Sequence, residues 1–204
     1  MTQSIAFIVP GRRESVLGDQ YQRLGHSFEE IGIKPEYIQP NWKLTSVAAL
    51  ASDTSRQIQQ IATQGKRVHG LGFSLGALSL LMASEHVRFE TIILCSMSFF
   101  REDIPHMGSI LRFFTRRILY RGTEPMEYPH TNQGKAFYLV YGERELSKIP
   151  PEVITLRERR FKGSQTVIAP NAGHSIAHKG YQATLRTLIR SIGQASQSSD
   201  HNLI

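Results

Sequence analysis

A chain of 204 residues, of which 40% are hydrophobic and 20% charged, is long enough to bury a substantial core and is composed like an ordinary globular protein. Its single cysteine, Cys95, excludes an intrachain disulfide, and its net charge of +7 comes largely from scattered lysines and arginines without a nucleic-acid-binding motif. The N-terminal apolar run is too short for a signal peptide or a spanning helix. We therefore expect one cytoplasmic domain over residues 1–204, with no membrane span and no nucleic-acid partner.

Short apolar runs alternate along the chain with segments whose apolar residues recur at helical spacing. The predicted strands are, in order, residues 4–9, 37–42, a run ending at the Gly72 turn, 91–97, 136–141 and 166–169. The predicted helices are residues 16–31, 47–61, the apolar run after Gly76, 152–161, and a closing helix whose apolar face runs from 181 to 192. Pro40 favours an edge position for the second strand. This alternation predicts an α/β fold, a three-layer α/β/α sandwich with a mainly parallel six-stranded sheet.

Two segments do not fit this alternation. Residues 99–134 connect the fourth and fifth predicted strands with about three times the length that a short loop needs. Within them, residues 110–119 have helical spacing, and we expect the whole insertion to form a small lid over the strand ends. Residues 194–204, QASQSSDHNLI, have the composition of a loose C-terminal tail.

The segment Gly72-Phe73-Ser74-Leu75-Gly76 lies between a predicted strand and a wholly apolar predicted helix. G-x-S-x-G in this context is the pattern of a nucleophile elbow, a sharp turn that holds the serine hydroxyl clear of the sheet. Glycine is needed at both ends because a larger side chain would collide with neighbouring backbone. Since the pattern alone arises by chance in roughly one chain in fifteen of this length, its interpretation depends on its partners.

Two further turns carry groups that could serve such a serine. Gly142-Glu143-Arg144-Glu145 follows the fifth predicted strand, and Asn171-Ala172-Gly173-His174 follows the sixth. In a parallel sheet, residues just beyond the carboxyl ends of the strands converge on one rim. The sequence therefore predicts a nucleophile, an acid and a histidine, in that order along the chain, at a single edge of the sheet.

This arrangement resembles the α/β-hydrolase superfamily over nearly the whole chain, from residue 5 to about residue 192, without the two antiparallel strands that larger members place first. The resemblance implies that Ser74 is the nucleophile and that His174, in Ala-Gly-His, is the base. Glu145 falls at the position of the acid in the family's G-x-x-D pattern. A histidine that removes the serine proton and a carboxylate that orients the histidine are what a weakly nucleophilic hydroxyl requires.

The resemblance also implies an oxyanion hole made by two backbone N–H groups. One belongs to Leu75, directly after the nucleophile, and the other to Arg12, in the turn after the first strand. Pro10-Gly11 stands where many members of the superfamily have His-Gly.

Several residues remain as alternatives for the acid and the base. Glu143 could supply the acid from a shifted turn, and Asp103 could supply it from just beyond the fourth strand. His178 is the nearest rival of His174, although its position indicates the start of the last helix. His69 lies inside the third predicted strand, where packing is the expected role, and His106 and His130 fall in the expected lid.

The leading interpretation is a serine hydrolase that cleaves a carboxylic ester or thioester through an acyl-enzyme on Ser74. The aromatic residues of the expected lid favour a substrate with an apolar acyl or aryl group: Phe99, Phe100, Phe113 and Phe114. A binding protein that keeps the fold without catalysis, and an acyltransferase with the same triad, are the alternatives. The sequence contains no metal-ligand cluster and no glycine-rich phosphate loop after a strand, so we expect no metal and no cofactor.

Overall fold

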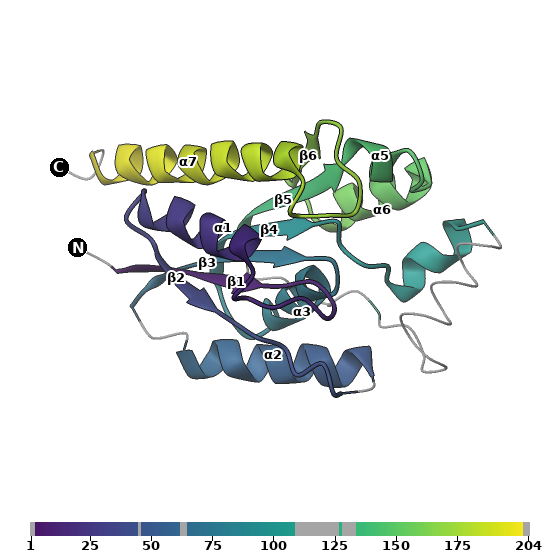
Figure 1. Ribbon diagram of the computed structural model, residues 1–204, viewed down its shortest axis with the longest axis horizontal. Helices are drawn as coiled ribbons and strands as arrows, with labels where there is room; N and C mark the ends of the chain where they lie inside the picture. Colours follow the sequence, from purple (N-terminus) through teal and green to yellow (C-terminus); the bar gives the residue numbers. More distant parts are fainter. Residues whose placement is uncertain (1–2, 45, 62–64, 109–126, 128–133, 202–204) are drawn as a thin grey trace.

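A six-stranded parallel sheet forms the centre of the computed structural model, which describes residues 3–44, 46–61, 65–108, 127 and 134–201 (Figure 1). In spatial order the strands are β2 (Lys34–Tyr37), β1 (Ser4–Val9), β3 (Arg67–Phe73), β4 (Phe89–Cys95), β5 (Gly134–Gly142) and β6 (Gln165–Ala169). Each strand pairs in parallel with its neighbour. The predicted class and the parallel six-stranded sheet are therefore confirmed.

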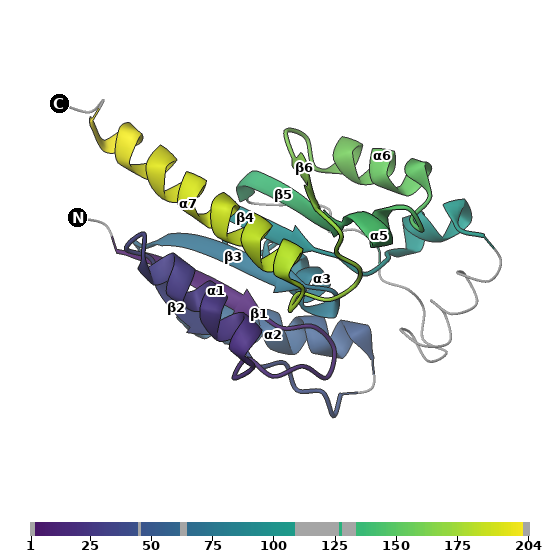
Figure 2. The same cartoon turned by 45° about the horizontal axis from the view of Figure 1, so that its top comes forward.

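Helices cover both faces of the sheet and complete three layers (Figures 1 and 2). The helices α1 (Asp19–Glu29) and α7 (Lys179–His201) pack on one face, and α2 (Val47–Ile61), α3 (Leu75–Ala83) and α6 (Pro151–Arg160) contribute to the core on the other. Alternate residues of β1 enter the two cores: Ile5, Phe7 and Val9 join the α2 and α3 side, and Ala6 and Ile8 join the α1 and α7 side. Both faces of the strand are buried because successive side chains of a strand point to opposite faces.

The structure corrects the predicted bounds of two elements near the N-terminus. Helix α1 begins at Asp19 and not at residue 16, because Gly18 is extended, and Leu17 is left 79% exposed. Strand β2 covers Lys34–Tyr37, whereas the prediction placed it at residues 37–42. Its pairing with β1 begins at Ile5 opposite Lys34, so a polar segment that lies on the edge of the sheet forms the strand. The edge position itself was predicted correctly.

The structure describes part of the insertion and most of the C-terminal segment. Within the expected lid, η1 (Arg101–His106) is a short 3-10 helix, and Phe100 and Ile104 beside and within it are buried. The helix predicted over residues 110–119 lies outside the described residues. At the other end, α7 runs through Gln194 to His201, so the segment expected to be a loose tail is helical there. No glycine or proline follows Gly193 to end the helix.

Among the described helices, none combines the length and the apolar character that crossing a bilayer requires.

Candidate active site

Ser74 lies at a strained turn between β3 and α3. Its φ of 53° and ψ of −115° place a residue other than glycine in a sparsely populated region of backbone space. The turn is held by a hydrogen bond from Ser74 N–H to the Cys95 carbonyl (2.8 Å) and by one from Leu78 N–H to the Ser74 carbonyl (3.3 Å). The geometry is that of the nucleophile elbow predicted from the G-x-S-x-G pattern.

Both glycines of the pattern are in contact with backbone atoms. A Cβ atom on Gly72 would lie 2.6 Å from the Ala77 Cα, and one on Gly76 would lie 2.3 Å from the Pro10 carbonyl oxygen. Such distances are well inside van der Waals contact, and backbone cannot move aside as the end of a flexible side chain can. The elbow therefore requires glycine at these positions, and the end of β1 packs directly against it.

His174 joins Ser74 to Glu145 through its two ring nitrogens. Its Nε2 atom lies 3.0 Å from Ser74 Oγ, and its Nδ1 atom lies 2.7 Å from Glu145 Oε1. The histidine side chain is 52% exposed and the glutamate side chain 14%. The Phe73 ring lies beside the imidazole, with the ring centroids 5.1 Å apart. The structure thus brings together the three residues that the sequence proposed as a triad, although they come from three separate loops.

The segments that carry Glu145 and His174 are in direct backbone contact with each other. Glu145 belongs to the short helix α5 (Glu143–Leu146), and the Arg144 N–H donates to the Ala172 carbonyl at 2.9 Å. A Cβ atom on Gly142 would lie 2.6 Å from the carbonyl oxygens of Ala172 and Gly173, so these two turns touch through their backbones. This contact fixes the distance between Glu145 and His174.

The alternative acids have other partners. Asp103 is fully buried and forms an ion pair with Arg157 at 2.7 Å, and its carboxylate also accepts a hydrogen bond from Phe100 N–H. Glu143 accepts a hydrogen bond from the Asn171 N–H at 2.7 Å. Of these three carboxylates, Glu145 is the one that contacts His174.

The other histidines considered as the base have different partners or surroundings. His178 accepts a hydrogen bond from the Gly180 N–H at 3.1 Å, where α7 begins. His69 is buried in β3, and desolvation by burial lowers the pKa of its imidazole to about 4. His106 is exposed in η1, and His130 lies outside the described residues. In the described part of the chain, His174 is the histidine that contacts Ser74.

Leu75, one of the two residues expected to form an oxyanion hole, begins α3 at the elbow, and the turn that contains the other, Arg12, packs against the elbow. Leu75 is the first residue of α3, so its N–H is among the donors that have no partner within the helix. Arg12 follows Gly11, whose N–H donates to Glu14 Oε2 and to the Tyr21 hydroxyl. A Cβ atom on Gly11 would lie 2.8 Å from the Phe73 ring, which brings this turn against the residue before Ser74.

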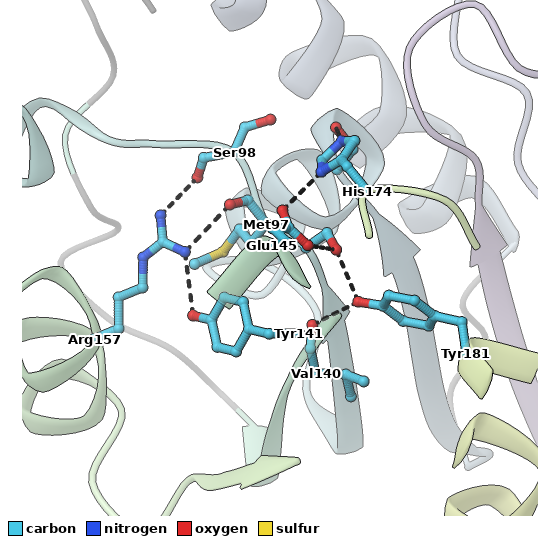
Figure 3. Close-up of polar contacts among 10 residues, drawn as sticks. Met97, Ser98, Val140, Tyr141, Glu145, Arg157, His174 and Tyr181 are labelled. Carbon is cyan, nitrogen blue, oxygen red and sulfur yellow. Dashed lines mark hydrogen bonds and ion pairs between the residues drawn. The ribbon is translucent and has the colours of Figure 1, made fainter. Parts of the chain in front are cut away.

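Three residues around the site were missed in the sequence. Ser96 donates a hydrogen bond to Glu145 Oε2, and its Oγ lies 2.8 Å from the Tyr181 hydroxyl (Figure 3). Arg157, fully buried on α6, donates to the carbonyls of Met97 and Ser98. In the sequence, Ser96 falls inside the fourth predicted strand, and Tyr181 falls on the apolar face of the last predicted helix. The signal available for Ser96 was a hydroxyl at the carboxyl end of a strand, where sites form.

In the residues that the structure describes, no group of three or more His, Cys, Asp or Glu side chains is arranged to hold a metal ion.

Solved structures of similar shape share this arrangement of strands and helices. Est1E from Butyrivibrio proteoclasticus is 14% identical with a TM-score of 0.67, and the match covers 97% of this chain and 88% of Est1E. The ydeN gene product of B. subtilis is 16% identical with a TM-score of 0.67, over 93% of this chain and 98% of that one. Mouse alpha/beta hydrolase domain-containing protein 10 is 13% identical with a TM-score of 0.66, over 95% and 90%. The chain has the α/β-hydrolase fold.

No family model matches the sequence, and no curated protein matches it. Because the identities to the solved structures are below 25%, the α/β-hydrolase fold is what these likenesses establish. A further structure of Est1E contains bound ferulic acid.

Proposed function

We propose that this α/β-hydrolase-fold protein is a serine hydrolase that cleaves a carboxylic ester or thioester through an acyl-enzyme on Ser74. The observation that carries the proposal is the continuous hydrogen-bonded series from Ser74 Oγ through His174 to Glu145, with distances of 3.0 and 2.7 Å. The 3.0 Å distance from His174 Nε2 to Ser74 Oγ lies within the range in which a base can remove a proton from a hydroxyl, and the 2.7 Å distance allows Glu145 to orient the imidazole by a hydrogen bond.

In the first half of the reaction, Ser74 Oγ attacks the carbonyl carbon of the substrate while His174 Nε2 takes the hydroxyl proton. The carbonyl oxygen becomes an oxyanion, which the N–H groups of Leu75 and Arg12 stabilise. Donors of this kind contribute roughly 3 to 4 kcal/mol each to the transition state. As the tetrahedral intermediate collapses, the imidazolium gives its proton to the departing alcohol or thiol, and the acyl group stays on Ser74.

In the second half, water takes the place of the leaving group. His174 accepts a proton from the water, the hydroxide oxygen attacks the acyl carbon, and the proton returns to Ser74 Oγ as the carboxylic acid leaves. Glu145 accepts the hydrogen bond of the His174 Nδ1–H throughout, which holds the useful tautomer and stabilises the positive charge on the imidazolium.

An apolar acyl or aryl group is the proposed substrate feature. Phe99 is partly buried at the start of the expected lid and remains a candidate for contact with such a group. Phe100 does not, because it is fully buried in the core. Phe113 and Phe114 lie outside the described residues. The ferulic acid bound to Est1E supports the inclusion of an ester with an aromatic acyl group among the substrates tested.

A substrate panel tests the proposal. It includes p-nitrophenyl esters of increasing acyl length, a feruloyl ester and acyl-CoA thioesters, each assayed with wild type and with Ser74→Ala. We expect at least one substrate to be hydrolysed, and the rate with Ser74→Ala to fall by about 10³-fold or more while the fold is kept. Equal rates for the two proteins would contradict the proposal, and no turnover of any substrate would favour the non-catalytic binding protein. Product analysis with added alcohols or amines distinguishes acyl transfer from hydrolysis.

A further inference from the structure

Both oxygens of the Glu145 carboxylate are hydrogen-bonded, and the second one leads to a buried pair of hydroxyls. Oε1 accepts from His174, and Oε2 accepts from Ser96, the residue directly after β4, which is 1% exposed. The Ser96 hydroxyl lies 2.8 Å from the hydroxyl of Tyr181, which reaches the site from α7 and also lies 2.8 Å from the Val140 carbonyl. Figure 3 shows this series of contacts running from His174 through Glu145 to Tyr181.

The protons available to these groups determine which group donates in each hydrogen bond. An ionised carboxylate and a carbonyl can only accept, so Ser96 must use its single proton for Glu145. The Tyr181 proton is then shared between Ser96 Oγ and the Val140 carbonyl, and that carbonyl already accepts the Ser96 N–H at 2.8 Å. Burial raises the pKa of Tyr181 well above its ordinary value, so its hydroxyl stays a donor.

The backbone of Ser96 is strained, and this strain indicates that the Ser96 hydroxyl has a role. Its φ is 44°, in the left-handed region that favours glycine and strains other residues. Glycine would remove this strain but would leave Glu145 Oε2 without its buried donor. A strained serine at a position where glycine would be unstrained indicates that the side chain has a role.

We propose that Ser96 is a positioning residue that fixes the carboxylate of Glu145 for its hydrogen bond to His174, and that Tyr181 supports Ser96 in turn. This inference rests on the proposed function. Glu145 needs such a contact because its backbone belongs to α5, a four-residue helix with no buried residue, and because its side chain has one more rotatable bond than an aspartate. A carboxylate whose second oxygen is already hydrogen-bonded loses less conformational entropy when the imidazolium forms.

Substitution at Ser96 separates positioning from simple packing. Ser96→Gly removes the hydroxyl and suits the positive φ, and Ser96→Ala removes the hydroxyl but keeps the Cβ and the strain. Because a hydrogen bond to a charged group is lost, we expect kcat to fall roughly 10- to 100-fold with KM unchanged in both variants. Tyr181→Phe should lower kcat only a few-fold, because Ser96 keeps its proton for Glu145.

Ser84→Ala is the matched control. Ser84 is also fully buried, and its hydroxyl donates to the Leu81 carbonyl at 2.6 Å, away from the triad. This variant should keep the kcat of wild type. If Ser84→Ala lowers kcat as much as Ser96→Gly does, or if Ser96→Gly keeps the kcat of wild type, the positioning role is wrong.

A second readout does not depend on turnover. In proton NMR spectra, the Nδ1–H of a histidine bound to a carboxylate gives a resonance at low field, and we expect one from His174 in wild type and Ser84→Ala. In Ser96→Gly it should broaden or disappear, while the midpoint of urea unfolding stays equal or rises. Absence of this resonance in wild type, or its persistence unchanged in Ser96→Gly, would overturn the inference. If wild type hydrolyses no ester but the resonance still depends on Ser96, the proposed function fails and the positioning role stands.

Discussion

Two carboxylates at the carboxyl end of the sheet each contact a nitrogen-containing side chain, and the two pairs differ in their exposure to solvent. Glu145 lies 2.7 Å from His174, with side chains 14% and 52% exposed. Asp103 lies 2.7 Å from Arg157, and both side chains are fully buried. Equal distances therefore accompany different environments. A base that must exchange protons with a substrate needs the exposed position, and a guanidinium that stays protonated can be enclosed.

The buried pair of Asp103 and Arg157 holds the backbone next to Ser74. Besides Asp103, Arg157 donates to the Met97 carbonyl at 3.2 Å, to the Ser98 carbonyl at 3.1 Å and to the Tyr141 hydroxyl at 3.2 Å (Figure 3). The Ser98 N–H in turn donates to the Ser74 carbonyl. The Asp103 carboxylate therefore holds the fold at this rim, while the Glu145 carboxylate contacts the histidine of the proposed triad.

Glu145→Gln should give the largest effect. A glutamine can donate its N–H₂ to His174 Nδ1 and so favour the wrong tautomer, and it no longer stabilises the imidazolium. We expect kcat/KM for a hydrolysed ester to fall about 10³- to 10⁴-fold, while the free energy of unfolding changes by about 1 kcal/mol or less.

Glu143→Gln is the matched control for that change. Glu143 contacts the Asn171 N–H and has no contact with His174, so this variant should keep its activity. Equal losses in the two variants would contradict the assignment of Glu145 as the acid.

Arg157→Met should act on stability. Removal of the guanidinium leaves Asp103 as a buried charge without its partner, which costs about 3 to 5 kcal/mol in the free energy of unfolding measured with urea. Arg159→Met, an exposed arginine on the same helix, should change it by about 0.5 kcal/mol or less. A double variant, Asp103→Leu with Arg157→Met, should recover part of the loss. Stability equal to wild type in Arg157→Met would show that the buried pair is not structural.

The buried His69 provides a test by pH, away from both pairs. Its folded-state pKa of about 4 lies below the ordinary 6.5, so below pH 6.5 the unfolded state takes up a proton that the folded state resists. The stability that this histidine contributes is complete above pH 6.5 and is lost as the pH falls to 4. The loss amounts to roughly 2 to 3 kcal/mol.

His69→Leu removes this titrating group. Urea unfolding at pH 7 and at pH 4.5 should therefore show a smaller loss of stability in His69→Leu than in wild type. The same loss in both proteins would contradict the buried neutral imidazole.

His178→Ala should give the smallest effect. Its ring accepts the Gly180 N–H at the start of α7, so loss of this contact should cost about 1 kcal/mol of stability. The rate of ester hydrolysis should change by no more than about 2-fold, whereas His174→Ala should reduce it to the level of Ser74→Ala. A large loss of rate in His178→Ala would move the base from His174 to its neighbour.

Much of the candidate site could be predicted because its members stand beside strand ends that the sequence marks clearly. Ser74 follows the buried strand β3 and lies between Gly72 and Gly76, which their close backbone contacts require, and His174 comes after Gly173 in the turn that follows β6. Glu145, Glu143 and Asp103 could not be separated in the same way. Their difference lies in which partner each reaches, and these partners are distant in the chain.

The errors in the fold have physical causes as well. Strand β2 is polar because it lies on the edge, so the hydrophobic pattern missed it and selected residues 37–42. Helix α7 continues to His201 through residues of modest helix propensity, which composition alone assigned to a tail. Arg157 falls among several charged residues of the predicted helix at residues 152–161, and only its packing shows that it is buried.

Covalent labelling of the native protein with a fluorophosphonate probe, followed by mass spectrometry of the labelled peptide, tests the central claim most directly. The account predicts one adduct, on Ser74, that forms in wild type and does not form in Ser74→Ala or after heat denaturation. A native protein that stays unlabelled, or an adduct that forms equally well in Ser74→Ala, would contradict it.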